Sequence, residues 1–234
     1  MSIFQFKYFS VFQENSSMKV GTDSMILGAL VESVNPSQIL DVGSGTGVLS
    51  LMMAQKFPEA KITGVELDLN AVRDCALNFR NSQWSDRLYL VQSNFLEFET
   101  EVKFDLIISN PPFFERSLKN KEESKTKARH TDSLPLEDLI REVSRLMTLD
   151  GAFWVVLPAD NAFKLMQLAE SFDLFPARII EIEGKPGSLI RNVIEFKGQR
   201  DIAFRKEVVC VRDGKGDYTS RYKELTAEFH NKQL

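Results

Sequence analysis

The sequence lacks the features of membrane-spanning, disulfide-linked and zinc-binding proteins. No apolar run approaches the roughly 18 residues that a membrane-spanning helix needs, and residues 1–12 mix Phe with Gln, Lys and Ser rather than resembling a signal peptide. Cys75 and Cys210 are the only cysteines, and their spacing is not that of a Cys-rich metal site. We therefore expect a cytoplasmic protein with no membrane anchor, no disulfide framework and no bound metal.

Composition and length are typical of one globular domain. The 234 residues are 43% hydrophobic and 26% charged, so we expect residues 1–234 to form a single domain, and a monomer. The net charge of −4 is unevenly spread. Residues 116–130 carry six Lys and Arg against two Glu, and residues 184–223 carry ten against five acidic residues. These basic segments suit either a polyanionic partner or a solvated surface.

Short apolar runs alternate with helical patterns from residue 38 onward. This alternation predicts βαβ units and a parallel sheet with helices on both faces. Residues 177–182 and 189–196, joined by a turn at Pro186-Gly187, suit an antiparallel pair at one edge. The fold class is therefore α/β and Rossmann-like, with a mostly parallel seven-stranded sheet. The other expected strands are 39–42, 61–66, 88–92, 104–109 and 152–157, and the expected helices are 48–57, 69–80, 135–147 and 161–170.

The N-terminal segment precedes this alternation. Residues 3–12 are rich in aromatic residues and suit a short strand or hairpin. Residues 18–30 lead into a helix, for which Thr22 or Asp23 is the predicted N-cap.

A glycine-rich loop follows the first strand of the predicted parallel sheet. Gly43, Gly45 and Gly47 have GxGxG spacing, and Val48 stands where the dinucleotide fingerprint requires its third glycine. Glycine permits a sharp turn and a close approach of the backbone to a ligand. Asp41 either accepts hydrogen bonds from an amino group of that ligand or orients the loop.

Two further polar residues end the next two strands. Glu66 lies about twenty residues beyond the glycines, where a carboxylate binds ribose hydroxyls. Asn94 follows the third strand and is placed to contact an adenine edge. Because the carboxyl ends of parallel strands share one edge of the sheet, these residues predict a site for a nucleoside-containing cofactor.

The tetrapeptide Asn110-Pro111-Pro112-Phe113 follows the fourth strand. The prolines stiffen the loop, which can direct the Asn110 side-chain oxygen and a proline carbonyl toward one point. Both groups are acceptors, and a planar NH₂ offers two donors. Phe113 or Phe114 supplies a face on which a flat base can stack.

This arrangement suits methyl transfer to an exocyclic amine. The lone pair of such a nitrogen is conjugated, and two acceptors that hold its hydrogens favour a more pyramidal, nucleophilic nitrogen. With S-adenosylmethionine as the donor the methyl group is already activated, and alignment supplies roughly 7–11 kcal/mol. The tetrapeptide residues are therefore the predicted catalytic residues. A nicotinamide-dependent oxidoreductase, which Val48 disfavours, and a cofactor-binding module without catalysis are the alternatives from other classes.

The motifs taken together resemble those of class I amino methyltransferases. Residues 6–9 and 18–29, with Ala128-Arg129-His130 and residues 218–226, are similar to the tRNA1(Val) (adenine(37)-N6)-methyltransferase family over nearly the whole chain. The resemblance implies N6-methylation of the adenosine 3′ of the anticodon in a valine tRNA. The partner would be the anticodon loop, held by the basic segments 116–130 and 184–223.

The resemblance also implies roles in the N-terminal segment. Lys19, Thr22 and Asp23 would wall the cofactor pocket, with residues 1–30 forming an extension over it. Asn94 stands where many relatives carry aspartate. Guanine-N2 methyltransferases of ribosomal RNA and glutamine-N5 methyltransferases of release factors share the Asn-Pro-Pro-aromatic loop, so they remain alternatives. His130 follows the basic stretch and either meets phosphate or substrate or is a solvated loop residue, and the sequence assigns no function to His230.

Overall fold

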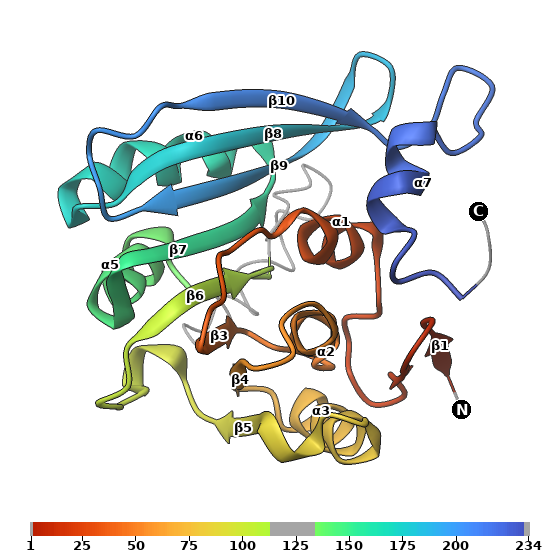
Figure 1. Cartoon of the computed structure of the whole chain (residues 1–234), viewed down its shortest axis with the longest axis vertical. Coiled ribbons are helices and arrows are strands. Elements are labelled where there is room, and N and C mark those ends of the chain that lie inside the picture. The colour runs from red at the N-terminus through yellow and green to blue at the C-terminus, as the bar shows by residue number, and fades with distance from the viewer. Residues whose placement is uncertain (1, 113–133, 232–234) are drawn as a thin grey trace, which may run out of the picture.

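A twisted, mostly parallel sheet forms the centre of the molecule. The computed structural model describes residues 2–112 and 134–231. Within them the main sheet has eight strands in the order β10-β8-β9-β7-β6-β3-β4-β5, with helices on both faces (Figure 1). The strands are β3 (Gln38–Val42), β4 (Lys61–Glu66), β5 (Leu88–Gln92), β6 (Phe104–Ser109), β7 (Met147–Leu157), β8 (Phe175–Lys185), β9 (Ser188–Lys197) and β10 (Arg205–Cys210).

The sheet separates two apolar cores, one on each of its faces. Ile39 and Trp154 face one core and Leu40 and Phe153 the other, because successive residues of a strand point to opposite faces. The first core is closed by α1 (Thr22–Leu30), α2 (Val48–Lys56), α3 (Leu69–Asn81) and α7 (Ser220–Thr226). The second is closed by α5 (Leu136–Leu146) and α6 (Ala159–Ala169). Short 3₁₀ helices within the described ranges are η1 (Ser85–Arg87), η2 (Phe95–Glu97) and η3 (Glu170–Phe172).

The Rossmann-like fold with a mostly parallel sheet is confirmed, and its strand count needs a correction. The antiparallel pair β8–β9 forms as predicted, but β10 adds an eighth strand parallel to β8. The pair therefore lies inside the sheet rather than at its edge. The pattern of β10 was obscured because Arg205, Lys206 and Glu207 dominate its first half, and charged residues are common on edge strands.

The N-terminal residues form a small hairpin beside α3. The strands β1 (Ile3–Gln5) and β2 (Ser10–Phe12) pair antiparallel, as predicted for residues 3–12. The predicted N-cap of α1 was wrong: the cap is Gly21, with no side-chain bond. The Asp23 carboxylate instead pairs with Arg191 of β9 at 2.8 Å.

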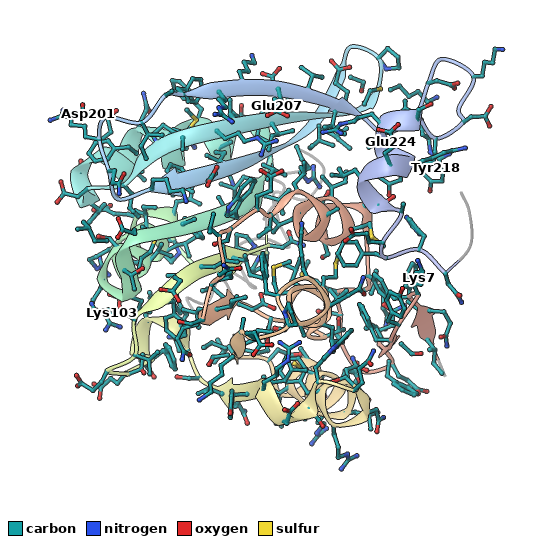
Figure 2. The ribbon with its side chains drawn as sticks, viewed as in Figure 1. Lys7, Lys103, Asp201, Glu207, Tyr218 and Glu224 are labelled. Carbon is teal, nitrogen blue, oxygen red and sulfur yellow. The ribbon has the colours of Figure 1, made fainter. Side chains whose placement is uncertain are left out.

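The C-terminal tail returns to the N-terminal hairpin. The Lys7 amide donates to the carbonyl of Phe229 at 2.9 Å, and Lys7 lies beside this part of the chain in Figure 2. Among the described residues, no helix is long and apolar enough to cross a membrane. In the same ranges, no group of three or more His, Cys, Asp or Glu side chains is arranged to hold a metal.

Candidate active site

The glycine loop turns sharply between β3 and α2. Gly43, Gly45 and Gly47 have φ angles of 70°, 56° and 79°, in the left-handed region that favours glycine. The amides of Gly43 and Ser44 both donate to the carbonyl of Val65, at 2.9 and 3.1 Å. The loop is thereby fixed against the carboxyl end of β4.

The three glycines have different surroundings. A Cβ added at Gly43 or Gly45 would meet nothing within 4 Å, so both border open space. A Cβ at Gly47 would come within 2.6 Å of Phe79 Cε1 and 2.7 Å of Cys75 Sγ. The first two glycines therefore leave room for a ligand against the backbone, whereas the third permits α2 and α3 to pack closely.

This contrast predicts that alanine at Gly47 mainly lowers stability, whereas alanine at Gly45 mainly lowers cofactor affinity. Gly47→Ala adds a steric clash to a left-handed strain of ~1–2 kcal/mol and should lower the Tm by at least about 5 °C. Gly45→Ala carries the strain alone and should lower the Tm less, yet its methyl group enters the ligand space and should weaken cofactor binding at least about tenfold. Thermal unfolding and calorimetric titration of both variants measure this. Equal losses of Tm and affinity in the two would contradict the assignment.

Glu66 lies against the glycine loop. Its Oε2 accepts from the Gly45 amide at 2.7 Å, and its Oε1 accepts from the amides of Leu67 and Asp68, both at 2.8 Å. A carboxylate has about four lone-pair positions, so Oε2 retains capacity for a further donor. The side chain is therefore held in place and can accept a ribose hydroxyl.

Asp41 is fully buried beneath the loop. Its Oδ2 accepts from the amide and the hydroxyl of Ser50, at 3.0 and 2.7 Å, and its Oδ1 has no partner among the described residues. Burial raises the pKa of Asp41 to about 7 from its usual value of 3.8. Of its two predicted roles, this geometry favours orientation of the loop, because Ser50 lies in the first turn of α2.

The raised pKa of Asp41 predicts a pH effect on stability. The folded state binds a proton more tightly than the unfolded state, so this carboxyl's contribution is fully present below pH 4 and is lost as pH rises toward about 7. Asp41→Asn removes this titration. The unfolding free energy of the parent minus that of the variant should therefore fall between pH 4 and 7 in denaturant titrations, and a constant difference would refute the prediction.

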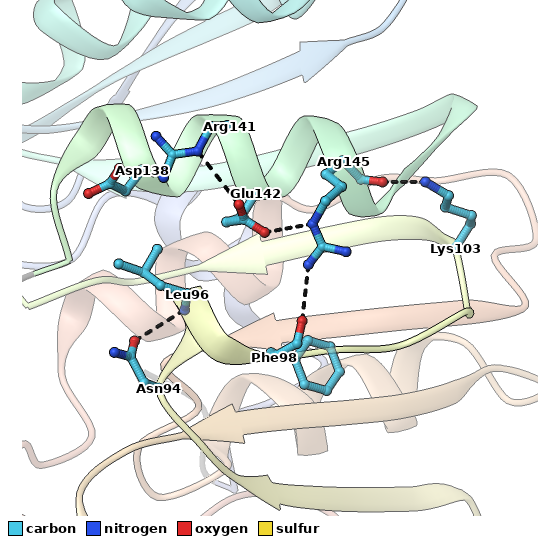
Figure 3. Close-up of polar contacts among 8 residues, drawn as sticks. All are labelled: Asn94, Leu96, Phe98, Lys103, Asp138, Arg141, Glu142 and Arg145. Carbon is cyan, nitrogen blue, oxygen red and sulfur yellow. Dashed lines mark hydrogen bonds and ion pairs between the residues drawn. The ribbon is translucent and has the colours of Figure 1, made fainter.

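Asn94 caps η2 rather than standing free in a loop. Its Oδ1 accepts from the Leu96 amide at 3.1 Å (Figure 3). The same segment is tied to α5, since Arg145 donates to the carbonyl of Phe98 at 3.0 Å (Figure 3). The side-chain nitrogen of Asn94, Nδ2, is therefore the group that remains available to contact a base.

Two apolar residues that the sequence reasoning missed lie at the same edge of the sheet. Leu67 directly follows β4 and is 50% exposed, and Leu96 lies beyond β5 and is 37% exposed. Exposed leucines at the ends of neighbouring parallel strands suit the faces of a nucleobase. An apolar residue directly after the strand-ending carboxylate was the available signal for Leu67.

Asn110 follows β6 and lies at a pocket of about 410 Å³. Its Nδ2 donates to Ser24 Oγ at 3.1 Å, and its Oδ1 is buried with no partner among the described residues. Pro111 is buried and Pro112 exposed, and Phe113 lies outside the described residues. The lining residues are Met18, Lys19, Gly21, Thr22, Asp23, Ser24, Asn110, Ile190 and Arg191.

This pocket brings together predicted and unpredicted residues. Lys19, Thr22 and Asp23 line it beside Asn110, whereas Ser24, Ile190 and Arg191 were not predicted. The Lys19 ammonium also donates to the carbonyl of Gln13. A larger hollow of about 590 Å³ lies beside β5 and is lined by none of the predicted site residues.

Two buried polar residues of α3 hold the N-terminal segment in place. Asp74 accepts from the amides of Asn15 and Ser16, at 2.9 and 2.8 Å. Asn78 accepts from the Phe12 amide at 2.8 Å and donates to the carbonyls of Phe12 and Thr46. Asn78 therefore links the hairpin directly to the glycine loop.

Solved structures share this fold. One, described as a predicted O-methyltransferase from Agrobacterium tumefaciens, superposes with a TM-score of 0.68 at 16% identity, over 88% of this chain and 96% of that chain. A glycopeptide N-methyltransferase solved with S-adenosyl-L-methionine gives a TM-score of 0.54 at 12% identity, over 75% of this chain and 94% of that chain. At such identities the likeness shows the fold alone.

Sequence comparisons identify the family. The model of the methyltransferase small domain matches residues 10–176. A tRNA1(Val) (adenine(37)-N6)-methyltransferase of Bacteroides thetaiotaomicron is 37% identical over 97% of this chain and 96% of its own length. The enzyme of the same name from Christiangramia forsetii is 37% identical over 98% of each chain. This chain therefore belongs to the tRNA1(Val) (adenine(37)-N6)-methyltransferase family, within the methyltransferases that carry the small domain.

Proposed function

We propose that this protein transfers the methyl group of S-adenosylmethionine to the exocyclic N6 of adenosine 37 in tRNA1(Val). The observation that carries the proposal is the buried Oδ1 of Asn110, which has no partner among the described residues and lies at the same sheet edge as the open glycine loop. An acceptor without a donor suits an incoming amine, because an unpaired buried polar atom costs free energy. The relatives' common name supports the choice of acceptor nucleoside.

The residues of this chain fit the proposed cofactor. Gly43 and Gly45 leave open space, Glu66 retains an acceptor position, and Leu67 offers an apolar face. We propose that these residues, with Gly47, Asp41, Asn94, Lys19, Thr22 and Asp23, bind or shape the cofactor site. Residues 1–30 would then form an extension over that site, within one domain of residues 1–234.

Catalysis by this arrangement consists of orientation. The bound sulfonium supplies an activated methyl group. Asn110 Oδ1 would accept one hydrogen of the target amine and a proline carbonyl of the tetrapeptide the other, which would leave the nitrogen lone pair available for the methyl group. Phe113, which lies outside the described residues, is proposed to stack on the base. Asn110 is neutral and therefore does not act as the base.

The surface around the site supports an RNA substrate. The strands β8 and β10 run parallel to β7, so Lys185 at the end of β8 and Lys215 beyond β10 emerge at the same sheet edge as Asn110. Both lysines are exposed. We propose that segment 184–223 holds the anticodon loop of the tRNA together with segment 116–130, all of which lies outside the described residues, and that a monomer acts on tRNA in the cytoplasm.

Charge reversal tests this surface. The double variant Lys185→Glu with Lys215→Glu should bind tRNA about tenfold more weakly at low salt, and the difference should shrink as salt rises, because each lost phosphate contact reduces the salt slope by about one. Lys61→Glu is the matched control, since Lys61 is exposed at the start of β4, on the opposite edge. Filter binding across a salt series measures both. Equal effects of the two substitutions would remove the proposed surface.

The acceptor class is tested by offering the protein three kinds of substrate in separate reactions. Labelled S-adenosylmethionine is supplied with total tRNA, ribosomal RNA or a release factor, each taken from cells that lack this protein's gene. Label should enter the tRNA fraction. Label in ribosomal RNA or release factor instead would favour the guanine-N2 or glutamine-N5 alternative.

A further inference from the structure

The two ends of the Asn110 side-chain amide have different surroundings. Nδ2 donates to Ser24 Oγ at 3.1 Å, whereas Oδ1 is buried without a partner among the described residues. The two ends of an amide are nearly identical in shape, so hydrogen bonds decide which way it faces. Methyl transfer as proposed requires the oxygen, and not the NH₂, at the target amine. The Ser24 hydroxyl can bond to either end, but the flipped amide would leave its NH₂ without this partner, and a buried N–H without an acceptor is tolerated less well than a carbonyl oxygen without a donor.

Ser24 is itself held firmly. It is 8% exposed in the first turn of α1, and its neighbour Asp23 is ion-paired with Arg191 at 2.8 Å. Further along α1, a Cβ on Gly28 would lie 2.5 Å from Met52 Cε, so α1 packs closely on α2. The hydroxyl is therefore presented to Asn110 from a rigid element, as orientation of a catalytic group requires.

We propose that Ser24 is a positioning residue, which accepts a hydrogen bond from Asn110 Nδ2 and thereby directs Oδ1 toward the target amine. The proposal rests on the proposed role of Asn110 and extends it to a residue of the N-terminal segment. It explains how residues distant in sequence complete one site, since 86 positions separate the two side chains.

Substitutions at Ser24 separate positioning from packing. Ser24→Ala should lower kcat about tenfold, equivalent to about 1.4 kcal/mol, with the Kd for S-adenosylmethionine unchanged. Ser24→Thr keeps the hydroxyl and should retain kcat within about threefold of the parent. Loss of activity in Ser24→Thr equal to that in Ser24→Ala, at unchanged Tm, would overturn the proposal.

A double-mutant cycle with Asn110→Asp gives a sharper test. Both ends of an aspartate side chain are acceptors, so its orientation needs no selection by Ser24. Adding Ser24→Ala to Asn110→Asp should therefore change kcat by less than about threefold, against about tenfold in the Asn110 background. The same loss in both backgrounds would show that Ser24 only supports packing.

A readout without turnover decides the proposal even if the substrate is wrong or the aspartate variant is inactive. In ¹⁵N-labelled protein, the Asn110 side-chain amide is assigned by its absence in Asn110→Asp. One of its protons should exchange slowly with water in the parent and lose that protection in Ser24→Ala. If the protein methylates no tRNA, the proposed function is refuted. If the proton nevertheless loses its protection in Ser24→Ala, the positioning role of Ser24 is retained. Equal exchange in parent and variant would refute the positioning role itself.

Discussion

Asn110→Ala should lower kcat for methyl transfer to tRNA roughly 10³-fold, while the Kd for S-adenosylmethionine stays within about twofold. The buried Oδ1 of Asn110 has no partner among the described residues, and alanine offers the target amine no acceptor in its place. Asn110 lies close to the glycine loop, since Ser109 of β6 pairs with Val42 of β3, but its proposed contact is with the target amine rather than with the cofactor. Binding and chemistry should therefore separate in this variant.

Single-turnover kinetics and calorimetric titration of the Asn110 variant measure these two quantities. Asn81→Ala is the control, because Asn81 is an exposed asparagine at the end of α3 and should leave both unchanged. Turnover of Asn110→Ala at the parent rate would eliminate the amide as the acceptor for the target amine.

Glu66→Ala should raise the Kd for S-adenosylmethionine roughly 100-fold. Hydrogen bonds to a charged group contribute about 1.5–3 kcal/mol each, and 1.4 kcal/mol corresponds to tenfold in affinity. The same carboxylate accepts from the Gly45, Leu67 and Asp68 amides, so its loss also frees the loop that borders the ligand space. The affinity for tRNA should change little, since a carboxylate makes no favourable contact with phosphate.

Glu59→Ala is the matched control for Glu66, since Glu59 is an exposed carboxylate before β4, at the other edge of the sheet. Titration of each variant with S-adenosylhomocysteine, which carries the same ribose, tests the contact without turnover. An unchanged Kd in Glu66→Ala would contradict the ribose contact and would move the cofactor away from β4.

The parts of the site that follow parallel strands could be predicted from sequence. Gly45 and Glu66 were each predicted at a strand end, and in the structure the Gly45 amide donates to Glu66 Oε2 at 2.7 Å. The order of strands and helices alone is sufficient for this, because such strand ends share one edge. Asn110 was found in the same way.

The contacts that complete the site could not be predicted. Ser24 meets Asn110 across 86 positions, and Asp23 meets Arg191 across 168, between elements whose spacing carries no signal of contact. No role was predicted for Asn78, although it joins the hairpin to the glycine loop. Such contacts depend on how α1 and α3 pack on the sheet, which only the folded chain defines.

The most direct test of the central claim is the identity of the methylated nucleoside. Purified protein is incubated with S-adenosylmethionine and an unmodified tRNA1(Val) transcript, which is then digested and analysed by mass spectrometry. N6-methyladenosine should form in the fragment that contains position 37, and a transcript with guanosine at that position should remain unmethylated. N2-methylguanosine, methylation of a different adenosine, or no methylated nucleoside in a protein that binds S-adenosylmethionine would contradict the account.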